Sequence, residues 1–330
     1  MPEITATVAV DAMGGDHAPS VVIEGVAAAL ANDQSLAVLL VGPDEIVSPH
    51  ATERCRPVPA SEVIAMDEHP ASAVRQKKDS SIVIGCKAVR DGRADAFFSA
   101  GSTGACMAAA TLGMGRIPGV SRPAIAAVIP GAAGATVLLD VGANADVKAD
   151  MLVQFALMGR AYSRTVLGVA EPRVGLLNIG EEETKGSLLA QEAHALMRGI
   201  PGFIGNVEGR DVPAGTVDVV VTDGFTGNVT LKVLEGLSKV LFSEIRAAVS
   251  ETAVSRLAAL AIAPSLRRLK GRLDPDAYGG APLLGVNGVC LIGHGSSNAR
   301  AIHSGVATAA RAARGRLTSA IQEGIAPVDA

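Results

Sequence analysis

Seven glycine-containing turns carry most of the residues in this sequence that could do chemistry. Each follows an apolar, strand-like run and adds polar residues to the glycine; the seven lie at 11–20, 99–104, 140–144, 178–186, 206–209, 223–228 and 293–299. Glycine lets a backbone approach a ligand closely, and hydroxyl and backbone N–H groups at a helix start bind anions. One such turn is also ordinary loop chemistry, but seven together predict an anion-binding site.

The clearest anion-binding pattern is a small hydroxyl residue between a strand and a helix. It occurs in SAGSTGA, with Ser102 and Thr103, and in GHGSSNA, with His294, Ser296 and Ser297. Both could cradle a phosphate, although neither contains the GxxxxGK of a nucleotide-binding P-loop. The sequence also lacks GxGxxG and GxSxG, which disfavours a nicotinamide dehydrogenase and a serine hydrolase of the α/β-hydrolase type.

Lys185 is the basic residue of most interest. It follows three glutamates at 181–183, at a predicted helix start, where an ammonium group could hold phosphate or donate a proton to a leaving group. The alternative is a surface lysine paired with those glutamates. His17 and His294 lie in two of the turns and could bind phosphate or transfer protons, or only stabilise the turns.

A metal site is a weaker interpretation of the same turns. Asp11, Asp16 and His17 could supply ligands, but nothing in their spacing makes them converge, and we expect no metal and no other cofactor. Cys106 follows GSTG at a helix start, where a thiol pKa could fall, yet a small buried thiol is the favoured interpretation. The four cysteines form no CxxC pair, which is typical of reduced thiols in a cytoplasmic protein.

The elements that must position these turns alternate along the chain. Strands are predicted at 6–11, 36–42, 95–101, 124–130, 136–142, 174–180, 203–209, 217–224 and 289–293, and helices at 20–33, 79–92, 148–164, 186–197, 225–248 and 296–316, with shorter helical stretches after residues 43 and 104. This alternation indicates an α/β fold, a three-layer αβα sandwich with a mostly parallel sheet. Such sheets bind ligands beyond the carboxyl ends of their strands, where the turns lie.

Composition excludes several functional classes. Hydrophobic residues make up 48% and charged residues 19%, which excludes a disordered chain, and a net charge of −4 excludes a chain-wide basic surface for nucleic acid. Aromatic residues make up only 2%, so stacking of single-stranded nucleic acid is disfavoured, whereas 37 glycines favour sites built from backbone. Residues 1–10 lack a signal-peptide pattern, and we predict no transmembrane helix.

Taken in order, the motifs closely resemble one family, the phosphate acyltransferases of the PlsX type. The matching segments cover nearly the whole chain: VAVDAMGGDHAP at 8–19, VGPDE at 41–45, ASAVRQKKDSSI at 71–82, SAGSTGA at 99–105, SRPAIA at 121–126, LLDVGAN at 138–144, LLNIGEEETKG at 176–186, VTDGFTGNVTLK at 221–232, YGGAPLLGVNG at 278–288 and HGSS at 294–297. The sequence departs from the usual sequence pattern of the family at 145–150 and 293–298, and neither departure removes a residue proposed here for the site.

The resemblance implies an activity, a fold and partners. The family converts acyl-acyl carrier protein and inorganic phosphate to acyl phosphate without a cofactor. The product passes to a membrane glycerol-3-phosphate acyltransferase in bacterial phospholipid synthesis. The implied fold is similar to that of isocitrate and isopropylmalate dehydrogenases, as a homodimer of two-lobed subunits, here about 1–120 plus 285–330 and 121–284. The enzyme would be cytoplasmic and peripherally associated with the inner face of the cell membrane.

The resemblance also assigns residues. The lysine and asparagine implicated in catalysis in the family correspond to Lys185 and Asn228. Phosphate is already an anionic nucleophile, so its attack on a thioester needs orientation and charge stabilisation rather than a nucleophilic side chain. We expect Lys185 to orient phosphate or stabilise the departing thiolate, and Asn228 to donate to the oxyanion. Candidate phosphate- and substrate-binding residues are Asp11, Gly14, Gly15, His17, Ser102, Thr103, Asn144, Asp223, Thr226, His294, Ser296 and Ser297.

Residues 251–275 form a compositional break. Five basic residues lie there with no acid between them, among leucines at helical spacing, and Pro264 predicts two short amphipathic helices. Such a segment could lie on an anionic membrane, dock an acidic acyl carrier protein or pack at a dimer interface. The residues expected to contact the membrane or the carrier are Leu257, Leu260, Leu266, Arg267, Arg268 and Lys270.

Two alternatives stay open at this stage. A coenzyme A-dependent phosphate acetyl- or butyryltransferase would share the thioester chemistry. A non-enzymatic phosphate-binding scaffold for lipid-synthesis enzymes would bind phosphate without turnover. Acyl phosphate formed from the carrier-protein donor, from coenzyme A only, or from neither distinguishes the three.

Overall fold

A computed structural model describes residues 3–325, apart from seven side chains in and just after a long helical hairpin: those of Ala253, Arg256, Leu257, Ala258, Leu260, Lys270 and Pro275. In this part of the chain a single sheet of eleven strands has the order β3-β2-β1-β4-β11-β10-β5-β6-β9-β7-β8. The strands are β1 Ala6–Asp11, β2 Leu36–Gly42, β3 Cys55–Pro59, β4 Ala96–Ser99, β5 Ala124–Pro130, β6 Ala135–Leu139, β7 Val174–Leu177, β8 Phe203–Val207, β9 Val219–Val221, β10 Ala281–Leu284 and β11 Val289–Ile292.

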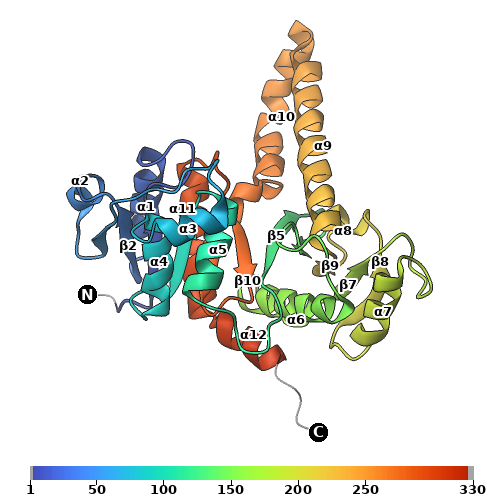
Figure 1. Ribbon diagram of the computed structural model, residues 1–330. Coiled ribbons are helices and arrows are strands. Elements are labelled where there is room, and N and C mark those ends of the chain that lie inside the picture. The colour runs from blue at the N-terminus through green and yellow to red at the C-terminus, as the bar shows by residue number, and fades with distance from the viewer. Residues whose placement is uncertain (1–2, 326–330) are drawn as a thin grey trace.

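Helices flank this sheet (Figure 1). They are α1 Ser20–Asn32, α2 Asp44–Val47, α3 Pro70–Gln76, α4 Ser81–Arg90, α5 Thr103–Gly113, α6 Ala149–Thr165, α7 Leu188–Met197, α8 Asp211–Ala214, α9 Gly224–Ser250, α10 Ala253–Arg272, α11 Ala299–Arg314 and α12 Leu317–Ile325, with 3₁₀ turns η1 Ser48–His50 and η2 Pro275–Ala277. The predicted α/β sandwich is confirmed.

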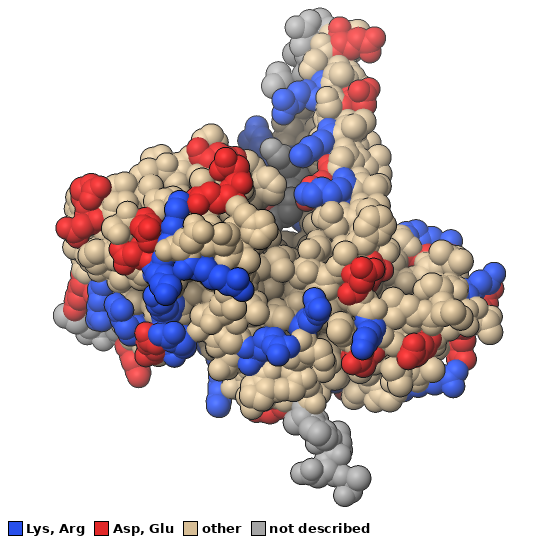
Figure 2. Space-filling view, in the orientation of Figure 1, with Lys and Arg blue, Asp and Glu red and all other residues tan. Residues whose placement is uncertain are grey.

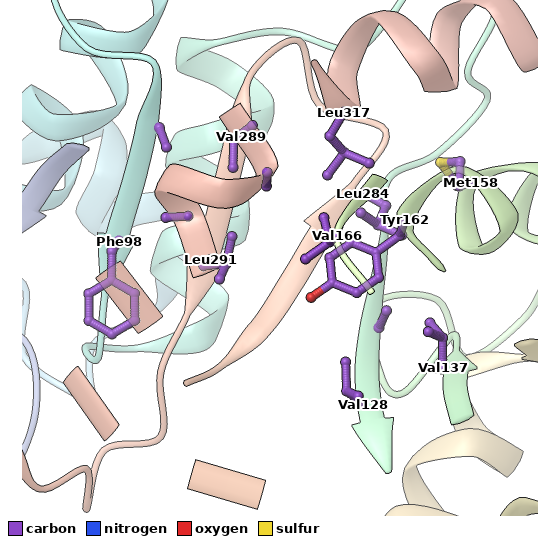
Figure 3. Close-up of a cluster of buried hydrophobic side chains, with 14 of the residues drawn as sticks. Phe98, Val128, Val137, Met158, Tyr162, Val166, Leu284, Val289, Leu291 and Leu317 are labelled. Carbon is purple, nitrogen blue, oxygen red and sulfur yellow. The ribbon is translucent and has the colours of Figure 1, made fainter. Parts of the chain in front are cut away.

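Both faces of the sheet are buried, and the strand sequences explain why. In β2 all seven residues of LAVLLVG are buried. Val38 and Leu40 belong to one apolar cluster, whereas Leu39 and Val41 belong to a second cluster. Successive side chains of a strand point to opposite faces, so each face carries its own core. Figure 3 shows part of the first cluster, with Phe98 and Leu291 at one end and Tyr162 and Val137 at the other.

Glycines on two helices leave room for the large aromatic rings in these cores. Gly85 of α4 lies against the ring of Phe97, and Gly305 of α11 lies against the ring of Phe98; a Cβ at either glycine would overlap the ring. The aromatic side chains therefore fill space that the glycines leave free, because interiors are packed to crystal-like density. The glycine excess thus serves the core as well as the turns.

Strand direction reverses near the middle of the sheet. Strands β1, β2, β3, β4 and β11 are parallel to one another, β10 is antiparallel to both β11 and β5, and β6 is antiparallel to β5. Strands β6, β9, β7 and β8 are again mutually parallel, now with the opposite direction to β11. The polar turns consequently fall into two groups, one for each parallel half, instead of following a single set of parallel strands.

The hairpin of α9 and α10 rises out of the body of the molecule (Figure 1). The prediction of two short helices broken at Pro264 is wrong, because α10 continues through this residue. Proline removes one backbone hydrogen bond, but α10 begins at a capping box of Thr252 and Ser255 and packs along α9, and packing provides most helical stability in proteins. Among the helices of residues 3–325, none is long and apolar enough to cross a membrane.

Candidate active site

The first group of turns follows β1, β4 and β11. Asp11, at the end of β1, is buried; its carboxylate accepts hydrogen bonds from the Ser99 hydroxyl at 2.7 Å and the Met13 N–H at 3.0 Å. Ser99 in turn accepts from the Gly101 N–H at 3.0 Å. Burial raises the pKa of Asp11, and the bond from Ser99 offsets part of that rise. Asp11 therefore joins two turns from inside.

Close backbone packing requires the glycines of the first turn. A Cβ at Gly14 would lie 2.7 Å from the Gly101 nitrogen and 2.8 Å from a carboxylate oxygen of Asp11. Gly15 has φ +107°, a conformation that favours glycine. The Asp16 N–H donates to the carbonyl of Gly295 at 2.7 Å. The turns at 11–20, 99–104 and 293–299 thus form one cluster.

Three helices begin at this cluster, α1, α5 and α11, and side chains cap the last two. Ser102 is buried and caps α5, accepting a hydrogen bond from Ala105, and Thr103 is exposed at the first position of the helix. Asn298 caps α11 in the same way. Unpaired N–H groups at helix starts favour anions.

The remaining predicted residues of this cluster divide by exposure. His17 and Ser296 are exposed, and Ser297 is buried. His294 is exposed and its Nδ1 lies 2.8 Å from the Ser296 hydroxyl. Exposed histidines beside helix starts can contact a ligand, whereas Ser297 supports the turn through its N–H, which donates to the His294 carbonyl at 2.9 Å.

The second group of turns is organised by a residue that sequence reasoning missed, Asp140. Its buried carboxylate accepts from the backbone N–H groups of Ile125, Gly142, Ala143 and Asn144 at 2.7–3.2 Å. The Asn144 amide adds a fifth bond at 2.9 Å. Burial raises the pKa of Asp140, and these donors offset part of that rise. The signal was present as the Asp of DVGAN, one residue after a buried strand.

Asn144 is more a part of this turn than a free ligand group. Its amide nitrogen also donates to the Pro123 carbonyl at 2.8 Å, and its own carbonyl accepts from the Gly224 N–H at 2.8 Å. These contacts connect the turn after β6 to the start of α9. The carboxylate of Asp223 caps that helix, accepting from the N–H and the hydroxyl of Thr226 at 2.8 and 2.7 Å.

Asn228 lies in the first turns of α9 and is exposed. A Cβ placed on Gly142 would be 3.8 Å from its amide oxygen, so the side chain lies beside the Asp140 turn. Within residues 3–325 the Asn228 amide makes no hydrogen bond. Asn228 is therefore the one predicted catalytic group of this helix start that is free to donate to a ligand.

Lys185 is carried by a loop whose backbone is held at several points. Amide nitrogens of Asn178, Gln191 and Asn206 donate to carbonyls at 182–186, at 2.8–3.2 Å. Asn206 is buried and also contacts the ring of His194 at 3.0 Å. The three side-chain amides fix the path of a loop that contains no helix or strand.

Two of the three glutamates beside Lys185 pair with other residues. Glu183 pairs with Arg198 and lies 3.6 Å from His194, and Glu181 lies 3.4 Å from Arg210. Lys185 is exposed, and in the described part of the chain its ammonium has no ion pair or side-chain hydrogen bond. The alternative of a lysine paired with its own glutamates is thus not what the structure contains.

Lys185 and Asn228 come from neighbouring strands. Strands β7 and β9 are paired, with Leu176 opposite Val221, so the turns that follow them begin side by side. Both predicted catalytic residues therefore belong to the second group of turns. The hydroxyl residues of the phosphate cradle belong to the first group, beyond the reversal of strand direction.

The structure also shows where the cysteines and the possible metal ligands lie. Cys106 is buried, and burial raises its pKa to about 12, so the interpretation as a small buried thiol is confirmed. All four cysteines are free and buried. No group of three or more His, Cys, Asp or Glu residues within 3–325 is placed to hold a metal ion.

The chain matches the family described as fatty acid synthesis protein over residues 6–319. It is 51% identical over 326 residues to the phosphate acyltransferase of Heliobacterium modesticaldum (strain ATCC 51547 / Ice1), covering 96% of this chain and 97% of the relative. It is 50% identical over 309 residues to the phosphate acyltransferase of Desulfitobacterium hafniense (strain DSM 10664 / DCB-2), covering 92% of each.

Solved structures show the same fold at low identity. A phosphotransacetylase from Streptococcus pyogenes has a TM-score of 0.63 at 17% identity, covering 93% of this chain and 94% of its own. A 4-hydroxythreonine-4-phosphate dehydrogenase from Klebsiella pneumoniae has a TM-score of 0.56 at 13% identity, covering 95% and 100%. At such identities the likeness concerns the architecture alone, and it agrees with the predicted sandwich.

Proposed function

The chain belongs to the fatty acid synthesis protein family, and we propose that it is a phosphate acyltransferase that makes acyl phosphate from acyl-acyl carrier protein and inorganic phosphate. The observation that carries this proposal is 51% identity, over 96% of the chain, to a protein named phosphate acyltransferase. The test is to incubate the protein with palmitoyl-acyl carrier protein or palmitoyl-coenzyme A and phosphate, and to measure acyl phosphate.

The reaction needs two kinds of stabilisation. A phosphate oxygen bonds to the thioester carbonyl carbon, the carbonyl oxygen becomes an oxyanion, and the C–S bond then breaks to release the carrier thiolate, which takes up a proton. The free amide of Asn228 donates to the oxyanion, and the free ammonium of Lys185 orients phosphate or stabilises the thiolate. The held backbone around Lys185 supports this role, because a preorganised donor loses little entropy during the reaction.

Removing either group tests its role. We expect Lys185→Ala and Asn228→Ala to fold normally, because neither side chain has a partner within the described residues. Loss of one such donor typically lowers kcat about 10²–10³-fold. Turnover close to that of the wild type in either variant contradicts the role of that residue.

The first group of turns is proposed as the place where phosphate is recruited. The starts of α5 and α11 and the exposed Thr103, His294 and Ser296 supply N–H, hydroxyl and imidazole donors. His294→Gln, which keeps a donor, is expected to raise the KM for phosphate less than His294→Ala. Equal and unchanged KM values in both variants contradict a phosphate contact at this residue.

An exposed apolar stripe on α9 supports the proposed homodimer. Its members recur at helical spacing, and a helix face of this kind is normally covered: Phe225, Val229, Val233, Leu237, Val240 and Leu241. Leu237→Asp is expected to yield monomers in light scattering, whereas Lys239→Asp, on another face of the helix, leaves the dimer intact. Dimers in both variants contradict this interface.

Helix α10 of the hairpin is proposed as the peripheral contact with the inner face of the membrane, from which acyl phosphate passes to a glycerol-3-phosphate acyltransferase. Val254 is 77% exposed and Ile262 48% exposed. Arg267 and Arg268 are exposed and Leu266 is half-buried, while the side chains of Leu257, Leu260 and Lys270 lie outside the described residues. Apolar and basic residues together favour an anionic bilayer surface.

Vesicle binding tests the membrane contact. Val254→Gln with Ile262→Gln is expected to weaken co-sedimentation with phosphatidylglycerol-containing vesicles. Leu112→Gln with Ile204→Gln, two exposed apolar residues of the body, is the matched control. Undiminished binding of the hairpin variant contradicts the proposed contact.

A further inference from the structure

A basic surface lies on the half of the molecule that holds the phosphate cradle. Residues 69–93, which include α3 and α4, contain six basic residues and two acids, a net charge of +4 in a chain of −4. Figure 2 shows Lys and Arg gathered on the front of this half, in the region of α3 and α4. We call this surface the basic face and define it by Arg75, Lys77, Lys78, Lys87, Arg90 and Arg93.

Some of these charges are already compensated. The Lys77 ammonium lies 2.6 Å from the Glu68 carboxylate, and Arg90 lies 2.8 Å from Asp91. Lys87 donates to the carbonyl of Lys78 at 3.2 Å. These cations stabilise the local fold and offer little to a partner.

Two cations of the basic face remain uncompensated. They are exposed and have no ion pair within the described part of the chain: Arg75 and Lys78. Arg93 is also exposed, but its charge helps to lower the pKa of Asp91. No large apolar side chain between 69 and 93 is prominently exposed. A membrane-binding surface combines cations with exposed apolar residues, as the hairpin does, so charge alone fits the acidic surface of a protein better.

The basic face adjoins the phosphate cradle. Helix α3 packs against α5, and a Cβ on Gly104 would lie only 2.6 Å from the ring of Pro70, the first residue of α3. Helix α5 begins at Thr103, capped by Ser102. A protein bound to α3 and α4 therefore lies next to the turn at 99–104.

We propose that the basic face docks the acidic surface of the acyl carrier protein, next to the turn at 99–104 where phosphate is proposed to be recruited. The inference rests on the proposed function, since it names where that donor binds. Complementary charge steers encounter and orients a partner, whereas the chemical step takes place elsewhere. Disrupting the face should raise the KM for the carrier-linked donor and leave kcat unchanged.

The test compares two donors and two matched double variants. Arg75→Glu with Lys78→Glu reverses the face, and Arg164→Glu with Arg316→Glu makes the same change in net charge at two exposed arginines elsewhere. The donors are palmitoyl-acyl carrier protein and palmitoyl-pantetheine, which carries no protein. Circular dichroism checks folding, and the neutral pair Arg75→Gln with Lys78→Gln replaces the reversal if that variant does not fold.

The expected result is a KM for palmitoyl-acyl carrier protein raised about tenfold or more in the face variant alone. Its kcat, its rate with palmitoyl-pantetheine and its binding to phosphatidylglycerol vesicles should stay at wild-type values. Added salt should raise the wild-type KM more than that of the variant, because salt screens exposed charges. An unchanged KM for palmitoyl-acyl carrier protein in the face variant overturns the proposal, and lost vesicle binding beside that unchanged KM would indicate a membrane contact instead. Wild-type protein that makes no acyl phosphate from either donor instead contradicts the proposed function.

Discussion

Asn206 gives the sharpest test of how the fold prepares Lys185. The side chain is buried, its amide nitrogen donates to the Glu182 carbonyl at 2.8 Å, and its oxygen lies 3.0 Å from Nδ1 of His194. Asn206→Ala leaves Nδ1 of the buried His194 without this partner and removes one of the two hydrogen bonds to the Glu182 carbonyl, which still accepts from the Lys185 N–H at 3.0 Å. A buried polar group left without a partner costs about 1–3 kcal/mol.

If that cost falls on the ordered loop around Lys185, the fraction of molecules with a correctly placed ammonium drops. Each 1.36 kcal/mol corresponds to about a factor of ten in rate, so kcat should fall by about 5-fold to 150-fold. The KM for the carrier-linked donor should change little, because docking lies elsewhere. The assay is acyl phosphate formation at saturating donor and phosphate.

A matched control separates positioning from general destabilisation. Thr136 is also buried in the same half of the sheet, and its hydroxyl donates to the Val217 carbonyl at 2.8 Å. Thr136→Val loses a comparable hydrogen bond without contacting the Lys185 loop and should keep wild-type kcat. The reasoning is refuted if Asn206→Ala keeps full kcat, or if both variants lose kcat equally.

Three further predictions concern stability and reactivity. Gly85→Ala places a Cβ against the ring of Phe97 and should lower the free energy of unfolding by about 1–3 kcal/mol in urea denaturation; an unchanged midpoint contradicts the packing described. The four buried thiols, including Cys106, should react with a thiol reagent at pH 8 only after unfolding, and rapid labelling of the native protein contradicts their burial. Burial raises the pKa of Asp11 above 3.8 in the folded protein. The protonated carboxyl therefore adds to the free energy of unfolding in full below pH 3.8, and this contribution is lost as the pH rises through the pKa of the folded state. Asp11→Asn should remove this part of the pH dependence of unfolding, and an unaltered slope contradicts it.

The sequence predicted the sandwich well, because buried strands and amphipathic helices leave strong local patterns. LAVLLVG is a continuous apolar run, and such runs occur where helices cover both faces of a sheet. The strand direction was harder to predict. Gly131 and Gly134 close a short hairpin between β5 and β6, a usable signal of antiparallel pairing. The four-residue β10, which contains Pro282, gives almost none.

The parts of the site that depend on residues close together in the sequence were predictable, whereas the parts that depend on distant residues were not. Asn228 and Asp223 follow a strand within one short motif, so their place at a helix start was predictable. The freedom of Lys185 depends on arginines 15 and 29 residues from the glutamates they pair with, and no local pattern reveals such pairs. Helix α10 passes Pro264 because of its packing against α9, which is also a long-range contact. The lobe boundaries stay a prediction.

Phosphate-dependent release of the carrier thiol tests the central claim most directly. Wild-type protein incubated with palmitoyl-acyl carrier protein should form acyl phosphate and free carrier thiol in equal amounts, only when phosphate is present, and Lys185→Ala should form little of either. Product from palmitoyl-coenzyme A alone would contradict the donor assignment. Phosphate binding without product from either donor would contradict the enzyme assignment and favour the scaffold.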